Sequence, residues 1–259
     1  HPRVRYYNAH IYNNYYDGNA KYGAGSTLGS SLYMENNYFR SCKFPMMISL
    51  QGSDVYAGTT TRDPTNYGTF SKEAGGMIKA YNNTMTGTYT FIPYGASTYI
   101  LKGSSTSIGS IDSSADFDAY VVSSASTKVP TSVTSYSGSN YYSNFDTNSS
   151  VMYSYTAEEP ADAVTTIQGT YGAGRMQQGD FEWTFTDSDD TSSDVNTSLK
   201  SALTNYTNSD FVGLFSDDTS SSGGDEEEEE PETPATSTDA TLKSLTVTGY
   251  SLAFSSSTT

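Results

Sequence analysis

The sequence has one cysteine and two histidines, and it lacks long hydrophobic runs. A single thiol, Cys42, cannot form an internal disulfide, and no Cys/His cluster has the spacing of a zinc site. We expect Cys42 to be a small buried core residue, as free cysteines usually are. No apolar stretch is long enough to span a bilayer. These absences exclude a disulfide framework, a zinc site and a membrane-spanning helix in this sequence.

The composition favours strands and turns over helices. Hydrophobic residues make up only 35% of the 259 residues, whereas Ser, Thr, Asn, Gly and Tyr are abundant. Aromatic and β-branched residues suit strands, and Gly, Asn and Ser suit turns. The sequence therefore predicts an all-β fold that is long enough to bury a core.

The net charge of −16 is unevenly distributed along the chain. Residues 1–103 contain nine Lys or Arg and five Asp or Glu, which gives +4 there and −20 in the remainder. This asymmetry predicts an anionic partner for the N-terminal stretch, and solvated linker and surface for the acidic remainder. Chance scatter of surface charge explains the same numbers, so charge alone does not decide.

A doubled asparagine recurs at the interval of a repeat protein. The first residues of the three pairs are separated by 23 and 46 positions, and the pairs are Asn13-Asn14, Asn36-Asn37 and Asn82-Asn83. A strand-like run precedes each pair ("HIY", "SLYM", "GMIKAY"). A circuit of about 23 residues with three short strands is what a right-handed parallel β-helix needs. "FPMMISL" reads as a further buried strand, followed by a long inserted loop over residues 52–76.

Stacked circuits would place the asparagines above one another as a structural ladder. At the inter-strand spacing, one side-chain amide can donate to the next and accept from the one before, and Asn also tolerates a left-handed corner. The aromatic residues that follow are expected to stack, Tyr15 over Tyr38 and Tyr16 over Phe39. These rings either pack in the core or form a face on which carbohydrate stacks, and core packing is the favoured alternative.

The rest of the sequence gives weaker signals. Residues 104–155 read as irregular loops with a few strands, and "AEEPADAV" as a possible helical turn. Residues 198–208 show helix spacing and predict one short amphipathic helix that caps the solenoid. Residues 1–215 would then be one β-helix domain. We expect a disordered acidic linker over 216–239 and the start of a truncated Ig-like or cadherin-like β-sandwich over 240–259.

Four segments in order resemble a known enzyme family. They are "HPRVRYYNAHIYNNYYDG", "SLYMENNYFRSCKFPMMISLQG", "GGMIKAYNNTMTG" and "GAGRMQQGDFEWTF". Together they resemble the C-terminal half of pectate lyases of the first polysaccharide lyase family. The resemblance implies a secreted or cell-surface enzyme, a monomer, that cleaves polygalacturonate by calcium-dependent β-elimination. It implies neither a nucleic-acid partner nor a membrane span.

The family signature, Arg-x-Pro-x-x-Arg, maps onto "HPRVR" only in part. Arg5 matches the second arginine, which implies that it binds a substrate carboxylate, and Arg3 occupies a variable position that is either a substrate contact or an exposed cation. The arginine implicated as base would precede His1, and the acidic Ca²⁺ ligands belong to circuits further upstream. We therefore expect no certain catalytic residue and no metal ligand in this chain, and no catalysis by the chain alone. His10 reads as a packed strand residue.

Two other functions remain open. A pectin lyase acting on methyl-esterified pectin without calcium has the same scaffold, although an ester offers no carboxylate for Arg5. A non-catalytic carbohydrate-binding or adhesin β-helix is the third interpretation, and "HPRVR" argues against it.

Overall fold

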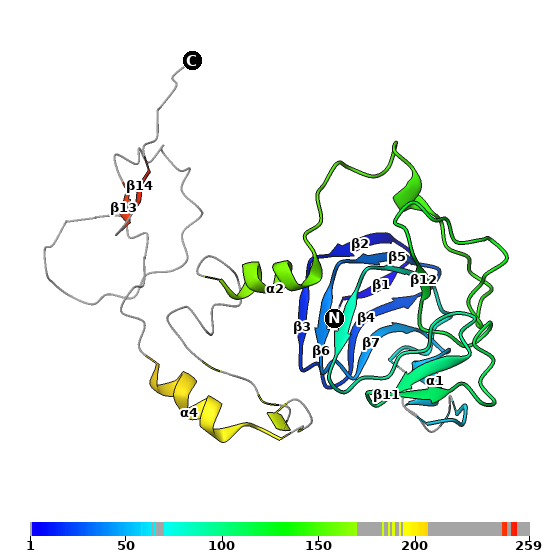
Figure 1. Cartoon of the computed structure of the whole chain (residues 1–259), viewed down its shortest axis with the longest axis horizontal. Helices are drawn as coiled ribbons and strands as arrows, with labels where there is room; N and C mark the ends of the chain where they lie inside the picture. Colours follow the sequence, from blue (N-terminus) through cyan, green and yellow to red (C-terminus); the bar gives the residue numbers. More distant parts are fainter. Residues whose placement is uncertain are drawn as a thin grey trace, which may run out of the picture. The chain divides into compact units, whose positions relative to one another are not determined.

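The structure is a computed structural model, and it describes residues 2–57, 59–63, 65, 70–169, 183, 186, 188–189, 192, 194–206 and the backbone of 245–247 and 250–252. The chain divides into two units, His1–Tyr206 and Thr207–Thr259. The first unit holds nearly all of the described residues and is built mainly from strands (Figure 1). Within the described residues, no helix is long and apolar enough to cross a membrane.

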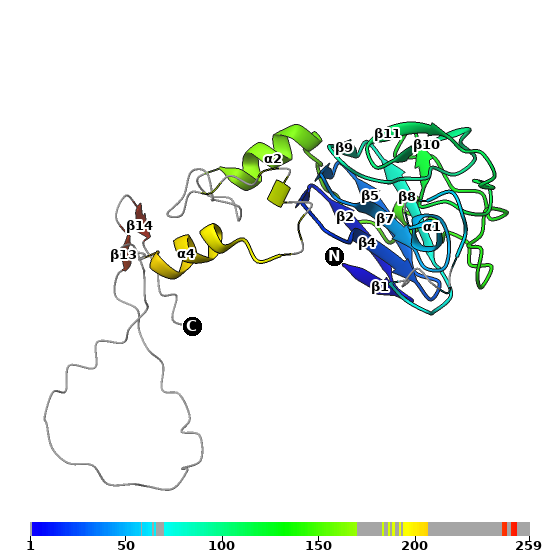
Figure 2. The same cartoon turned by 90° about the horizontal axis from the view of Figure 1, so that it is seen from below.

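Three parallel sheets make up the body of the first unit, and successive circuits of the chain contribute one strand to each. The first sheet has the order β1-β4-β7, with bounds Arg3–Arg5, Tyr22–Thr27 and Phe44–Ile48. The second has the order β2-β5-β8-β12, with bounds Asn8–Tyr12, Ser31–Glu35, Met77–Tyr81 and Tyr120–Val122. The third has the order β3-β6-β9, with bounds Tyr15–Asp17, Tyr38–Arg40 and Thr84–Thr86. Figure 2 shows the strands of the first two sheets as successive layers.

The register follows the repeat of the sequence. His10 pairs with Tyr33, and Tyr33 pairs with Lys79, so these offsets equal the intervals between the doubled asparagines. Alternate side chains of each strand face opposite sides of its sheet. Ile11, Tyr16 and Ala24, which come from three different sheets, belong to one buried cluster, so the sheets enclose a common core (Figure 1).

Cys42 lies in this core and is fully buried, as the sequence predicts. Burial raises the pKa of its thiol to about 12, which makes it an unreactive packing residue. Strand β7 covers the first five residues of the predicted strand "FPMMISL", and all five are buried. The insertion after it contains a short helix, α1, at Ser53–Tyr56.

Residues 90–155 pack against this body, and several of their apolar side chains join its core. Strands β10 (Thr98–Leu101) and β11 (Ser104–Ser107) form an antiparallel pair, whereas β12 extends the second sheet in parallel. Beyond β12 the chain is irregular, with one 3-10 turn, η1, at Phe145–Thr147. The sequence predicted this mixture of loops and a few strands.

The helices differ from those predicted. Helix α2 runs from Pro160 to Gln168 where the sequence suggested only a helical turn, and it packs against β3 and β6. Helix α4 runs from Thr197 to Asn205, close to the predicted helix, but none of its residues is buried. The predicted short C-terminal helix is thus present, but it is not the only helix of the described residues, and it has no buried residue with which to cap the solenoid.

The second unit contains an antiparallel pair, β13 (Leu245–Val247) and β14 (Tyr250–Leu252). Both strands lie within the segment in which the sequence predicted the start of a β module. The predicted acidic linker, residues 216–239, lies outside the described residues, as does most of "GAGRMQQGDFEWTF".

Two buried aspartates hold α1 and its flanking loops in place. Asp118 accepts hydrogen bonds from the Ser53 N–H (2.7 Å), the Ser53 hydroxyl (2.6 Å) and the Ile92 N–H (2.8 Å). Asp54 accepts from the N–H groups of Leu50 and Phe70, both at 2.9 Å. Burial outweighs these donors and raises the pKa of Asp118 to about 7 and that of Asp54 to about 6.

These shifts predict a protein that loses stability as the pH rises from 5 to 8. The folded state keeps protons that the unfolded carboxyl groups, with pKa values of about 4, have already released, so folding takes up protons in this range. The urea midpoint at pH 5 is therefore expected to exceed that at pH 8. In Asp118→Asn the midpoint should fall at both pH values, but the difference between them should shrink. An unchanged difference would contradict the role of Asp118.

Candidate functional site

Strand β1 carries both arginines of the "HPRVR" motif on the outer face of the first sheet. Arg3 and Arg5 are exposed, and Val4 between them packs against the core. Arg5 forms an ion pair with Glu73, with 2.8 Å between Nη2 and Oε1, and the side chains are 45% and 30% exposed. The structure thus places a carboxylate on the arginine for which the sequence predicts carboxylate binding.

The segment that carries Glu73 covers the same outer face. Arg3 Nη1 donates to the carbonyl oxygen of Phe70 at 3.4 Å. The Phe70 ring belongs to a cluster with Tyr22, Phe44 and Met47. The Phe70 ring also packs directly over Gly25. A β-carbon on residue 25 would lie only 2.7 Å from the ring, so a glycine is needed at this position. Arg3 is therefore an exposed cation beside Arg5 that makes one long hydrogen bond to the backbone.

Three other cations of the N-terminal stretch are paired with carboxylates within the protein. Arg40 pairs with Asp17, and Arg62 pairs with Asp116 at 3.1 Å. Lys79 pairs with Asp146. The basic excess that the sequence shows over residues 1–103 is thus partly neutralised inside the fold. Arg3 and Arg5 remain on an accessible face.

The second asparagine of each pair forms an amide ladder. Asn14 Nδ2 donates to Asn37 Oδ1 at 3.0 Å, and Asn37 Nδ2 donates to Asn83 Oδ1 at 2.9 Å. The backbone N–H groups of Asn14 and Asn37 donate to the same two oxygens, both at 3.1 Å. Each rung therefore joins two donors of one circuit to one oxygen of the next.

The first asparagine of each pair makes no amide-to-amide rung, so the predicted ladder of six side chains is formed by three of them. Asn13, Asn36 and Asn82 have φ values of 51°, 51° and 47°, the left-handed conformation of the corner. Asn13 Nδ2 still donates to the Asn36 carbonyl oxygen of the next circuit at 3.2 Å, and all three side chains hold the segment before α2. Asn13 and Asn36 donate to the Glu158 carbonyl oxygen at 2.7 and 2.8 Å. Asn82 donates to Glu159 Oε2 at 2.9 Å.

Both predicted aromatic pairs are in contact, but only the inner pair is stacked. Tyr16 lies 4.5 Å from Phe39 with an interplanar angle of 7°, and both rings are buried. Tyr15 meets Tyr38 edge to face at 5.8 Å. The inner pair is core packing, and only the outer pair is placed to meet solvent or a ligand.

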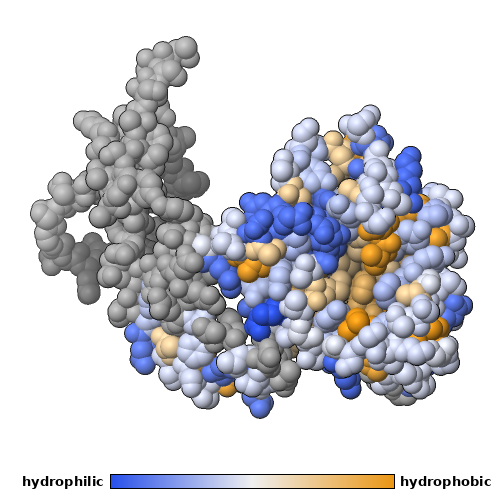
Figure 3. Space-filling view, viewed as in Figure 1, coloured by the Kyte–Doolittle hydropathy of each residue, from blue (hydrophilic) through white to orange (hydrophobic). Residues whose placement is uncertain are grey.

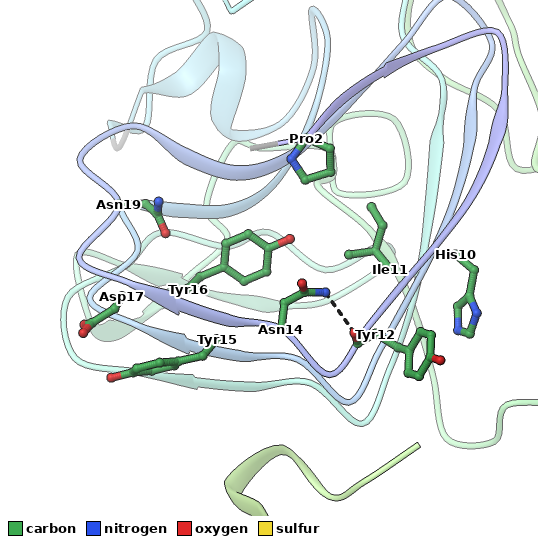
Figure 4. Close-up of a pocket in the computed structure, with 9 residues that line it drawn as sticks. All are labelled: Pro2, His10, Ile11, Tyr12, Asn14, Tyr15, Tyr16, Asp17 and Asn19. Atoms are coloured by element: carbon green, nitrogen blue, oxygen red, sulfur yellow. Dashed lines mark hydrogen bonds between the residues drawn. The ribbon is translucent and has the colours of Figure 1, made fainter. Parts of the chain in front are cut away.

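A hollow of about 700 Å³ opens at the first circuit. Figure 4 shows Ile11, Tyr16 and Asn14 directed into it, and Tyr15 and Asp17 directed away. Strands β1, β2 and β3 are the edge strands of their sheets at this end. The hollow lies between these three edge strands, and the Asp17 carboxylate, the acidic group among its described lining residues, is directed away from it (Figure 4).

His10 lies in a buried polar network on the outer face of the second sheet, as a packed strand residue. Its Nε2 is 2.7 Å from Glu35 Oε1, and both side chains are only 4% exposed. Glu35 also accepts hydrogen bonds from the hydroxyl groups of Tyr33, at 2.7 Å, and Tyr155. Although burial opposes ionisation, the hydrogen bonds from His10, Tyr155 and Tyr33 keep the Glu35 pKa below its usual value. His10 Nδ1 lies 2.9 Å from the Tyr153 hydroxyl, so the network ties residues 153–155 to the sheet.

A buried ion pair lies next to this network. Lys79 Nζ is 2.6 Å from Asp146 Oδ2, and the two side chains are 0% and 1% exposed. The same ammonium group donates to the Ala125 carbonyl oxygen at 2.6 Å and lies 4.9 Å from the Tyr33 ring centroid. This pair could not be predicted from the sequence, because Asp146 lies in a segment without any periodic pattern.

The described residues do not fit a calcium site. Among them, no three His, Cys, Asp or Glu side chains come close enough together to hold a metal ion. Ca²⁺ takes six to eight oxygen ligands, several of them from carboxylates. The Ca²⁺ ligands that the resemblance puts in circuits before His1 remain a prediction.

Comparisons with known proteins give no relative. No family model, no curated protein and no solved structure matches the chain.

The sequence found the arginines and the asparagines but missed their partners. Glu73 and Phe70 lie in the predicted inserted loop, and Glu158 lies in the predicted helical turn. A carboxylate within a basic stretch was the one available signal for Glu73.

Proposed function

We propose that this chain is the substrate-binding part of a pectate lyase, which acts on polygalacturonate by calcium-dependent β-elimination. The three parallel sheets are then the faces of a right-handed parallel β-helix, and the outer face of β1-β4-β7 binds the polysaccharide. The circuits of 22 or 23 residues, the shared core and the amide ladder support this fold.

One observation carries the proposal: Arg5 holds a carboxylate on an accessible sheet face. Guanidinium groups bind carboxylates through charge-assisted hydrogen bonds in a fixed geometry. A galacturonate residue offers such a carboxylate next to its C5 proton. Pairing with Arg5 withdraws charge from that carboxylate, which favours removal of the proton. Arg3 lies two residues away on the same face, where it can contact a second uronate.

We propose that cleavage needs the circuits that would precede His1 in a longer protein. Within the described residues, we assign no base and no metal ligand. We expect the chain alone to bind polygalacturonate without cleaving it. The longer protein should give a calcium-dependent rise in ultraviolet absorbance as a C4=C5 double bond forms. No such rise would favour a non-catalytic carbohydrate-binding β-helix, and a rise with methyl-esterified pectin alone would favour a pectin lyase.

Arg5→Ala tests the binding site. Loss of a charge-assisted hydrogen bond to a carboxylate is expected to weaken polygalacturonate binding by about tenfold or more. Affinity gel electrophoresis against polygalacturonate and fully methyl-esterified pectin measures this, with the unesterified polymer bound more tightly by the unchanged chain.

Lys128→Ala is the matched control, since it removes one positive charge from an exposed side chain. Binding should be unaffected, and the urea midpoint of both variants should stay close to that of the unchanged chain. Equal losses in the two variants would mean that net charge, and not Arg5, governs binding.

A further inference from the structure

The Glu73 carboxylate is held by a small set of donors on the proposed binding face. Oε1 receives the guanidinium of Arg5 at 2.8 Å. Oε2 accepts a hydrogen bond from the Ser71 hydroxyl at 2.9 Å, and the Thr27 hydroxyl, which donates to the Ala74 carbonyl oxygen at 3.0 Å, lies 3.5 Å away. A cation and a hydroxyl group that converge on one carboxylate are donors that a uronate would also require.

The backbone of this segment is anchored independently of the Glu73 side chain. The Ser49 hydroxyl donates to the Glu73 carbonyl oxygen at 2.7 Å and lies 3.0 Å from the Ser71 carbonyl oxygen. The Leu28 N–H donates to the Ala74 carbonyl oxygen at 2.7 Å. The Glu73 side chain is 30% exposed. Release of Arg5 therefore needs only a rotation of one side chain, with no movement of the loop.

We propose that Glu73 is an internal competitor for Arg5, which occupies the position of a substrate carboxylate and is displaced when a polyuronate binds. This inference rests on the proposed function. Glu73 then lowers the affinity for acidic polysaccharide and makes binding depend on an exchange of one carboxylate for another.

The competition is weak enough to be reversed by substrate. Ion pairs between half-exposed side chains contribute little, because water and salt screen them. Removal of the Glu73 charge is therefore expected to tighten polygalacturonate binding by about two- to fivefold. Fully methyl-esterified pectin should gain nothing, since it has no carboxylate to exchange.

Glu73→Gln in the full chain tests the proposal, with polygalacturonate as the probe. Gln keeps the size of the side chain and an acceptor for Ser71, and it removes the charge. Asp162→Asn is the matched control, because it removes one negative charge from an exposed position on α2. Arg5→Ala and the double variant Arg5→Ala/Glu73→Gln complete a thermodynamic cycle.

The cycle separates competition from general repulsion. We expect Glu73→Gln to tighten binding in the presence of Arg5 but not in its absence, and Asp162→Asn to have no effect. An equal gain with and without Arg5, or no gain at all, would overturn the role of Glu73 while leaving the proposed function intact. If neither the unchanged chain nor Glu73→Gln binds polygalacturonate, the proposed function fails and the inference fails with it.

Discussion

Replacing Lys79 by Met is expected to lower the free energy of unfolding by about 3–5 kcal/mol. The change leaves Asp146 as an unpaired carboxylate whose side chain is 1% exposed, and it removes the donor to the Ala125 carbonyl oxygen. Attraction between the buried charges compensates for their desolvation only while both are present. Urea denaturation followed by circular dichroism measures the loss.

Two further variants make this prediction specific. Arg40→Met breaks the ion pair with Asp17, whose partners are 24% and 25% exposed, and it should cost about 1 kcal/mol or less. Lys79→Met combined with Asp146→Leu should recover much of the stability lost by Lys79→Met, because no charge is then left buried. A double variant as unstable as the single one would show that the loss comes from packing instead.

Asn37→Ala is expected to destabilise the protein by about 3 kcal/mol, the second largest effect. Asn37 is fully buried, and its amide accepts from two donors of Asn14 and donates to Asn83. It also donates to the Ile11 carbonyl oxygen at 2.9 Å. Alanine leaves several of these groups in the core without a partner, and thermal unfolding reports the cost.

Asn14→Ala is the control for the ladder. Asn14 has the same chemistry but lies exposed at the first circuit, where water can replace its bonds. Its backbone N–H still reaches Asn37 Oδ1 after substitution. We expect a loss of about 1 kcal/mol or less. Similar losses at both positions would contradict a ladder whose strength comes from burial.

The sequence predicted the parts of the fold that repeat. The interval between the asparagine pairs predicted the pairing of β2, β5 and β8, because a strand that recurs once per circuit must meet its own repeat. The same interval predicted the stacking of Tyr16 on Phe39. It did not distinguish the two asparagines of a pair, since the left-handed corner and the ladder each need only one of them.

Contacts between the repeats and the irregular segments could not be predicted. Arg5 and Glu73 are 68 residues apart, and Lys79 and Asp146 are 67 apart. Nothing in the local pattern around Glu73 or Asp146 indicates which cation each one meets, because these pairings depend on how the loops fold back. The sequence therefore predicted that Arg5 binds a substrate carboxylate, and only the structure shows that Arg5 pairs with Glu73.

The amide column has a direction. Every rung donates toward the later circuit, so the Asn14 side-chain carbonyl oxygen, and not its amino group, is left for a circuit that precedes it. A side chain of such a circuit that meets Asn14 must therefore be a hydrogen-bond donor. Asparagine would continue the series there, whereas aspartate would set oxygen against oxygen and stop its growth.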